Sequence, residues 1–345
     1  LVLAGVMVLS MTACGGNTAE TTSAAAKTQE TAADTASKAE ETTGAEASES
    51  ETAAKAEGTT YKIGVLQLVQ HTALDAANDG FIAALDDAGI AYEVDQQNAS
   101  GDQSACQTVA SKFANEKKDL ILAIATPAAQ AMVGAVEDTP VLITAVTDPA
   151  ESGLVDTNEK PGANVTGTSD LTPVKEQIDL LKQLVPEAKT VGVLYCSAES
   201  NSKIQADMAK EAIAAAGMES KEYTVSSSNE IQTVVQSMVG AVDAVYAPTD
   251  NVIAAGMATV GMVAGDNNLP VICGEAGMVQ NGGLATYGID YYQLGYMTGQ
   301  QAVKILTEGA SPADMPIEYL PAEKCELTVN EETAQTLGID VSGLE

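Results

Sequence analysis

From residue 61 onward, short apolar runs alternate with segments whose apolar residues recur at helical spacing. Residues 63–66 predict a buried strand, and the next segment predicts a helix that ends at Gly89. The apolar positions of this helix are Leu74, Ala77, Phe81, Leu85 and Ala88. Further strands are predicted at residues 92–94, 120–125 and 140–145, with a helix over residues 106–115. Such alternation indicates a parallel, doubly wound α/β sheet.

The second half of the chain repeats this pattern. Residues 191–194 (VGVL) correspond to residues 63–66 (IGVL), and Gly217 corresponds to Gly89 at the same offset. Two such halves predict two lobes of one architecture, built from residues 61–170 plus 290–318 and from residues 171–289 plus 319–345. The helix predicted at residues 291–306 returns to the first lobe. These repeated crossings predict a hinge that can close over a ligand.

The first residues have the character of a targeting segment. Residues 1–10 are apolar, too few to span a bilayer, and Met11-Thr12-Ala13-Cys14 follows them. The small residues before Cys14 resemble a lipoprotein processing site, which implies that residues 1–14 are a signal peptide region and that Cys14 carries the lipid. The alternative is an ordinary secretory signal in which Cys14 has no role. We expect the protein outside the cytoplasm, anchored to the outer face of the cell membrane by this lipid alone.

Residues 15–60 contain no aliphatic side chain larger than alanine and no aromatic residue. Alanine, threonine, glutamate, serine and lysine dominate, so the segment cannot bury enough apolar surface to offset the entropy of ordering. The sequence predicts a disordered acidic tether between the membrane and the folded lobes.

Charge and composition exclude several classes of partner. The chain has 16 Lys+Arg against 48 Asp+Glu, a net charge of −32, and all of its basic residues are lysines. Such a surface repels nucleic acid, and the guanidinium fork that often holds phosphates or dicarboxylates is missing. The absence of tryptophan removes the indole platforms on which many sugar sites depend. We expect a monomer.

Catalysis has little support in the sequence. His71 is the only histidine, which excludes multi-histidine metal sites and most Ser/His/Asp arrangements. No Gly-x-Ser-x-Gly, dinucleotide-binding or phosphate-loop motif occurs, so we expect no enzyme, no cofactor and no metal. The cysteines at 106, 196, 273 and 325 lack Cys-x-x-Cys spacing and are expected to be free thiols.

Polar residues follow nearly every predicted strand, where ligands bind in parallel α/β sheets. The candidate ligand-binding residues are Gln67, His71, Asp75, Thr126, Ala128, Thr147, Asp148, Ser197, Asn201, Asp250, Glu275, Tyr287 and Asp290. Structural roles compete with this interpretation, because Thr126, Asp250 and His71 could cap helices and Asp148 could set a turn before Pro149. Glu275 directly follows a buried strand and therefore needs solvent or a cationic partner.

Residues 67–75 (QLVQHTALD), followed by Asp79-Gly80-Phe81, resemble the start of the tryptophan/tyrosine-type ABC transporter substrate-binding proteins. The resemblance covers roughly residues 61–339 and includes residues 125–128, 146–149, 248–251 and 282–288. It implies a two-lobed type I periplasmic-binding-protein fold, an amino-acid-like and often aromatic ligand, and an ABC permease with its ATPase as partners.

An amino acid also suits the candidate residues. Hydroxyls and backbone N–H groups at helix starts, such as Thr126 and Thr147, can hold a carboxylate without arginine. Glu275, Asp250 and Asp290 are available for the ammonium group. A purine, a sugar or another small organic ligand is the alternative, as is a surface module that senses a ligand and signals to a partner.

Overall fold

The computed structural model describes residues 58–344. The predicted signal peptide, Cys14 and the tether as far as residue 57 lie outside the described residues. Within residues 58–344 no helix combines the length and the apolar character needed to cross a membrane.

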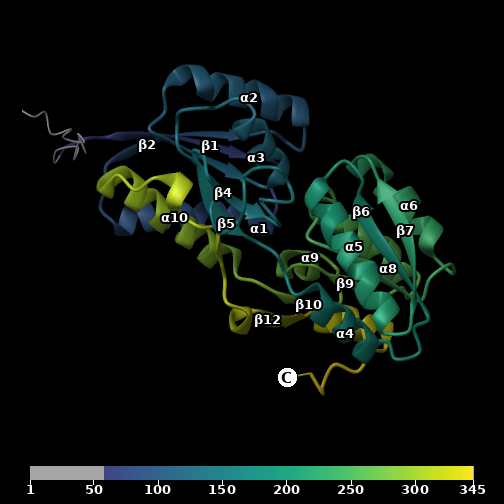
Figure 1. Ribbon diagram of the computed structural model, residues 1–345. Helices are drawn as coiled ribbons and strands as arrows, with labels where there is room; N and C mark the ends of the chain where they lie inside the picture. Colours follow the sequence, from purple (N-terminus) through teal and green to yellow (C-terminus); the bar gives the residue numbers. More distant parts are fainter. Residues whose placement is uncertain (1–57, 345) are drawn as a thin grey trace, which may run out of the picture. The chain divides into compact units, whose positions relative to one another are not determined.

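The first sheet has six parallel strands in the order β11-β5-β4-β3-β1-β2 (Figure 1). They are β1 (Tyr61–Gln67), β2 (Tyr92–Asn98), β3 (Leu120–Ile124), β4 (Val141–Val146), β5 (Val165–Ser169) and β11 (Glu318–Tyr319). Its helices are α1 (Thr72–Asp87), α2 (Gln103–Glu116), α3 (Thr126–Val133) and α10 (Tyr291–Glu308). Every residue of β3 and β4 is buried, as their continuous apolar runs predict for strands covered on both faces.

The second sheet has the order β12-β10-β9-β8-β6-β7, in which only β12 is antiparallel. Its strands are β6 (Thr190–Cys196), β7 (Glu219–Val225), β8 (Ala244–Ala247), β9 (Val271–Cys273), β10 (Ala285–Gly288) and β12 (Glu326–Val329). Its helices are α4 (Val174–Leu184), α5 (Ser200–Ala215), α6 (Ile231–Met238), α7 (Asn251–Ala255), α8 (Met257–Asp266), α9 (Ala276–Gln280) and α11 (Glu331–Leu337). Short 3-10 turns lie at Ser228–Glu230, Pro312–Asp314 and Ala322–Lys324. Apart from the outermost β11 and β12, the two strand orders are the same, as the sequence repeat predicts.

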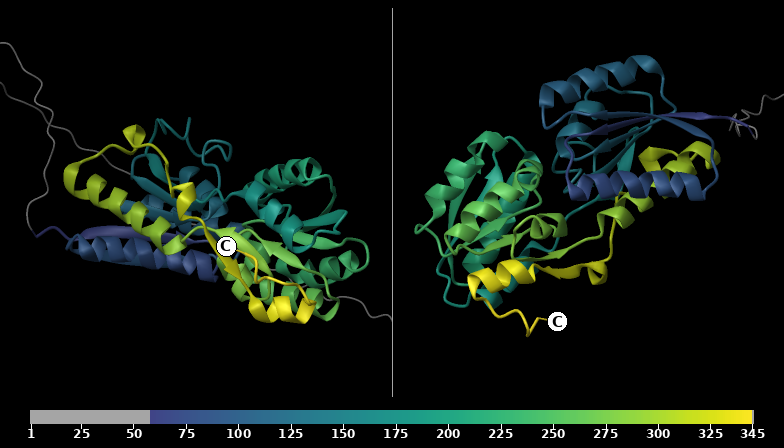
Figure 2. Two further views of the ribbon diagram at one scale, coloured as in Figure 1. Left: turned by 90° about the horizontal axis from the view of Figure 1, so that it is seen from below. Right: turned by 180° about the vertical axis from the view of Figure 1, so that it is seen from behind.

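Helices α1 and α10 pack side by side against the first sheet, so the return of residues 291–306 to this lobe is confirmed (Figure 2). Glycines allow this close approach. An added Cβ at Gly80 would collide with the backbone of Tyr292, and one at Gly295 would collide with the carbonyl of Ala77.

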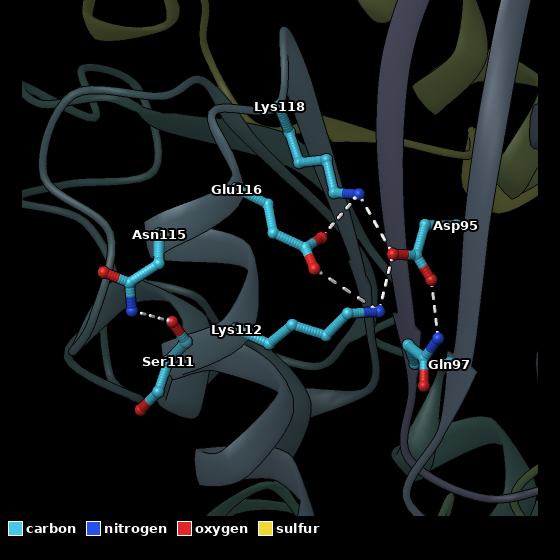
Figure 3. A network of polar contacts seen from close by, with 7 residues as sticks. All are labelled: Asp95, Gln97, Ser111, Lys112, Asn115, Glu116 and Lys118. Atoms are coloured by element: carbon cyan, nitrogen blue, oxygen red, sulfur yellow. Dashed lines mark hydrogen bonds and ion pairs between the residues drawn. The ribbon is translucent and has the colours of Figure 1, made fainter.

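Strand β2 forms an edge of the first sheet and carries polar residues at alternate positions. Asp95 Oδ2 accepts hydrogen bonds from Lys112 Nζ at 2.6 Å and Lys118 Nζ at 3.0 Å, and Gln97 donates to its other oxygen (Figure 3). Burial alone would raise the pKa of Asp95, but these three donors lower it well below its usual range. The lysines also cover the face of Phe113, so this network ties helix α2 to the edge strand.

The chain passes between the two sheets after β5, after β10 and after β11. The last crossing corrects one predicted boundary. Residues 318 and 319 were assigned to different lobes, but Tyr319 pairs with Ser169 in the first sheet, so the chain leaves that sheet only after Tyr319.

Candidate ligand-binding site

Loops from the carboxyl ends of both sheets meet around a small pocket of about 10 Å³, which is room for one water-sized group. Its walls are His71, Leu74, Ala145, Asp170, Asn201, Thr249, Asp250, Asn251, Ala254, Glu275 and Tyr291. We call this the central pocket. A cavity of about 310 Å³ shares Glu275 and Tyr291 with it, and one of about 400 Å³ shares Asn251. The structure therefore brings together His71, Asn201, Asp250 and Glu275 from the candidate set.

Four carboxyl groups are buried at or beside this pocket. Asp170 and Glu275 are each 4% exposed, Glu199 is 3% exposed and Asp250 is 2% exposed. Among the described residues, none of the four takes part in a salt bridge, and their hydrogen-bond donors are all neutral. Buried carboxyl groups without a cation are expensive to ionise, so this arrangement favours a positively charged guest.

The pKa values of these four carboxyl groups reflect their burial without a cationic partner. Burial raises the pKa of Asp170 to about 6 and that of Glu275 to about 7. Burial, reinforced by the charge of Asp250, raises the pKa of Glu199, and burial also raises that of Asp250. Hydrogen-bond donors lower each value only in part. An entering ammonium group would supply the missing counter-charge.

Asp250 and Glu275 each combine a structural role with a place on the pocket wall. Asp250 caps α7 by accepting from the N–H of Ile253 at 2.8 Å, and it also accepts from the N–H of Cys196 at 2.5 Å. Glu275 caps α9 through the N–H groups of Gly277 and Met278, at 2.5 and 2.8 Å. The capping alternative is thus realised for Asp250. Glu275, expected to need solvent or a cation, is satisfied in part by backbone donors.

Three of the candidate residues have a buried polar atom without a hydrogen-bond partner. Nδ1 of His71 and Oδ1 of Asn201 lie on the wall of the central pocket, whereas Oγ1 of Thr126, a residue that is 1% exposed, lies at the start of α3 and is not part of that wall. Unpartnered buried polar atoms are rare in stable folds, so these atoms are candidates for contacts with a ligand. His71 occupies the position before α1, but its side chain makes no capping bond.

The backbone is strained where the first sheet approaches the site. Ala125 has φ 83° and ψ 151°, and Ala145 has φ 55°, conformations that non-glycine residues seldom adopt. Ala125 directly precedes Thr126 at the start of α3, and Ala145 lies on the pocket wall. Such strain is frequent at ligand sites, where the surrounding structure fixes an otherwise unfavourable turn.

Besides the exposed bonds that Gln103 and Gln130 donate to Ala198 and Ser200, two hydrogen bonds join the lobes at the site itself. His71 Nε2 lies 3.3 Å from Asn251 Oδ1, and Gln205 Nε2 donates to Thr147 Oγ1 at 3.0 Å. The same amide of Gln205 also donates to Thr249 Oγ1, so one fully buried side chain connects the ends of β4 and β8. Thr147 in turn donates to Asp170 at 3.2 Å.

Four other candidate residues lie away from the central pocket on the first sheet. Gln67 donates to Asp75 at 2.6 Å, so these two side chains satisfy each other beside α1. Ala128 is fully buried in the hydrophobic core. Asp148 accepts from the N–H of Glu151 and from Asn158, as the turn alternative predicts, and it lines a separate cavity of about 510 Å³.

The remaining three candidates are peripheral as well. Ser197 is exposed and bonds the carbonyl of Val225. Tyr287 packs against the core of the second sheet, and its carbonyl accepts from Gln177. Asp290 caps α10 and lines the 310 Å³ cavity.

The sequence analysis missed Asp170, Glu199, Asn251, Tyr291 and Gln205. Glu199 and Asn251 lie within two positions of Asn201 and Asp250, so the loops were identified but not every residue on them. Asp170 was missed because β5, with the polar sequence VTGTS, was not predicted as a strand.

The cysteines at 106, 196, 273 and 325 are free, which confirms the expectation for these four. In the part of the chain that the structure describes, no group of three or more histidine, cysteine, aspartate or glutamate side chains is placed to hold a metal ion.

Comparison with known proteins places this site in a family. Residues 62–343 match the family model described as ABC transporter substrate binding protein. The chain belongs to this family. The substrate-binding protein is 45% identical over 279 residues to the tyrosine-binding protein of Clostridioides difficile (strain R20291), a match that covers 80% of each chain.

Solved structures agree. The ABC domain in complex with L-Trp from Streptococcus pneumonia is 39% identical, with a TM-score of 0.80 over 83% of this chain and 97% of that one. The ligand-free, open structure of a substrate binding protein with adhesive properties from Clostridium difficile is 46% identical, with a TM-score of 0.64 over the same shares. These relatives confirm the resemblance to the tryptophan/tyrosine type and the type I periplasmic-binding-protein fold.

Family membership establishes the general function. The protein binds a small-molecule substrate for an ABC transporter and works outside the cytoplasm. Proteins of this kind generally bind their substrates without converting them.

Proposed function

We propose that this protein captures an aromatic amino acid, tyrosine or tryptophan, and delivers it to an ABC permease driven by its ATPase. The observation that carries the proposal is the central pocket, where buried carboxyl groups line a space the size of one ammonium group and form no salt bridge with any lysine of residues 58–344. The names of the relatives support the ligand class, since one is a tyrosine-binding protein and another was solved with L-Trp.

In this proposal the α-ammonium group lies among Glu275, Asp170 and Asp250. The α-carboxylate is held at the end of the first sheet, where the unpartnered hydroxyl of Thr126 stands at the start of α3. The hydroxyl of Thr147 donates to Asp170 and accepts from Gln205, so it has no hydrogen left for the carboxylate. Acid groups that come mainly from one sheet and a hydroxyl from the other would make closure depend on a ligand with both charges.

The arrangement of the described residues supports a ligand-bound form. The TM-score is higher with the L-Trp complex than with the ligand-free, open structure, although the latter is the more similar in sequence. An amino acid is far larger than the 10 Å³ pocket, so entry requires the hydrogen bonds that join the sheets to separate. We infer that these bonds form again once the ligand is bound, and that the ligand extends from the central pocket into the adjoining cavities of about 310 and 400 Å³.

The membrane attachment and the oligomeric state also belong to the proposal. Lipidation of Cys14 would anchor the protein, residues 15–60 would give it reach, and the protein would act as a monomer. No catalytic step is needed for this role.

Calorimetric titration with tyrosine, tryptophan, phenylalanine, leucine, glucose and adenosine tests the proposed ligand class. Tyrosine or tryptophan should bind most tightly and should raise the melting temperature by mass action. Binding of glucose or adenosine, with none of the amino acids bound, would refute it.

A further inference from the structure

One ring nitrogen of His71 faces the central pocket and can accept a hydrogen bond. Neither the ammonium nor the carboxylate group of the ligand requires this acceptor. The residue lines the pocket, and its Nδ1 is buried without a hydrogen-bond partner. Its other ring nitrogen, Nε2, faces Asn251 Oδ1 at 3.3 Å. What Nδ1 can bind depends on which nitrogen carries the proton.

A chain of hydrogen bonds answers that question. Glu199 Oε2 receives the side-chain amide of Asn251 at 2.7 Å, the backbone N–H of Asn251 at 3.3 Å and the amide of Asn201 at 3.3 Å. Because Asn251 Nδ2 donates to Glu199, Asn251 turns its carbonyl oxygen toward His71. A carbonyl oxygen only accepts, so Nε2 must be the protonated nitrogen.

Burial also favours the neutral form of the ring. Burial lowers the pKa of His71, and the hydrogen bond to Asn251 and the charge of Asp75 offset this only in part. The Nδ1 atom of a neutral ring that is protonated at Nε2 carries a lone pair and no hydrogen. The central pocket therefore offers one uncharged acceptor beside its carboxyl groups.

We propose that Nδ1 of His71 accepts a hydrogen bond from the side chain of the ligand, from the phenol O–H of tyrosine or the indole N–H of tryptophan. This inference rests on the proposed function and adds the basis of selectivity to it. The ammonium group has three hydrogens, for which Glu275, Asp170 and Asp250 supply three acceptors. The carboxylate has no hydrogen to donate, so the side-chain donor is what remains for Nδ1. Phenylalanine has no such donor and would leave Nδ1 buried and unpartnered.

The test compares similar ligands with and without this donor. Tyrosine is paired with phenylalanine and with O-methyltyrosine, and tryptophan is paired with 3-benzothienylalanine, in which sulfur replaces the indole N–H. Calorimetry on the wild-type protein should show each donor ligand binding about tenfold more tightly than its partner, the size of one buried hydrogen bond. These measurements need no variant.

Two variants test whether the preference for ligands with a side-chain donor depends on His71. His71→Leu removes the acceptor and should bring both ratios close to one, mainly by weakening tyrosine and tryptophan. Asn78→Leu is the matched control, because Asn78 lies two turns further along α1, also has an unpartnered buried oxygen, and is absent from the pocket wall. It should leave the ratios unchanged.

The outcomes separate this inference from the proposed function. Equal affinity for tyrosine and phenylalanine in the wild type, or ratios that survive His71→Leu in a folded variant, would overturn the role of His71 while amino-acid binding stands. A protein that binds none of these amino acids would overturn the proposed function itself.

Discussion

Replacing Glu275 by glutamine tests whether its carboxylate serves the ligand or only the helix that it caps. The side chain is 4% exposed, and burial raises its pKa from 4.5 to about 7. Since the folded-state value is the higher one, the stability contributed by protonated Glu275 is fully present below pH 4.5 and is lost as the pH rises through about 7. At about 1.4 kcal/mol per pH unit, the interval between 4.5 and about 7 corresponds to about 3 kcal/mol.

Glutamine resembles the protonated carboxyl group, so the ligand-free variant should escape this loss. Melting curves and urea titrations at pH 4.5 and pH 8.5 should show Glu275→Gln gaining about 3 kcal/mol over the wild type between the two pH values. Amino-acid affinity at pH 7.5 should fall at least tenfold, because removing one partner of a buried charge pair typically costs about 2–5 kcal/mol.

Asp243→Asn provides a control of opposite sign. Asp243 also accepts two backbone N–H groups, from Lys189 and Thr190, but it is exposed and those donors lower its pKa. Its contribution is present at neutral pH and lost in acid, so this variant should lose stability at pH 8.5 and keep full affinity. If Glu275→Gln behaves in the same way, Glu275 only caps α9 and the reasoning about the ammonium group is refuted.

Three further predictions concern closure, packing and anchoring. Gln205→Leu removes the hydrogen bonds that connect Thr147 with the second sheet and should weaken ligand binding by about 1–3 kcal/mol; unchanged affinity in calorimetry would show that this contact does not favour closure. Gly295→Val places a side chain against the Ala77 carbonyl and should lower the free energy of unfolding by about 1–3 kcal/mol or more in urea titration; an unaltered midpoint would contradict the close helix approach. Cys14→Ser should release the protein from the membrane fraction or leave it unprocessed, and normal processing with unchanged fractionation would exclude the anchor.

The fold was predictable because most of its strands are buried on both faces. A strand such as β3 has only apolar residues, which gives a signal that needs no knowledge of its neighbours. Strand β5 gave no such signal. Its threonines are buried because Thr168 Oγ1 lies 3.0 Å from Thr144 and 2.8 Å from Thr298, a hydroxyl chain that reaches α10 about 130 residues later. A polar strand made stable by partners so distant in sequence cannot be recognised from local pattern.

The same limit explains the candidate site. Strand ends identify loops, and those loops did bring His71, Asn201, Asp250 and Glu275 to one pocket. Which residue of a loop faces inward depends on turn geometry, so exposed Ser197 was selected and buried Glu199 was not. The function of His71 depends in addition on hydrogen bonds with residues that are distant in the sequence. Its acceptor is defined by Asn251, whose orientation is defined by Glu199, and those residues are 180 and 128 positions away along the chain. The sequence motif around His71 therefore identifies the family, but only the assembled hydrogen-bond chain determines what that side chain can bind.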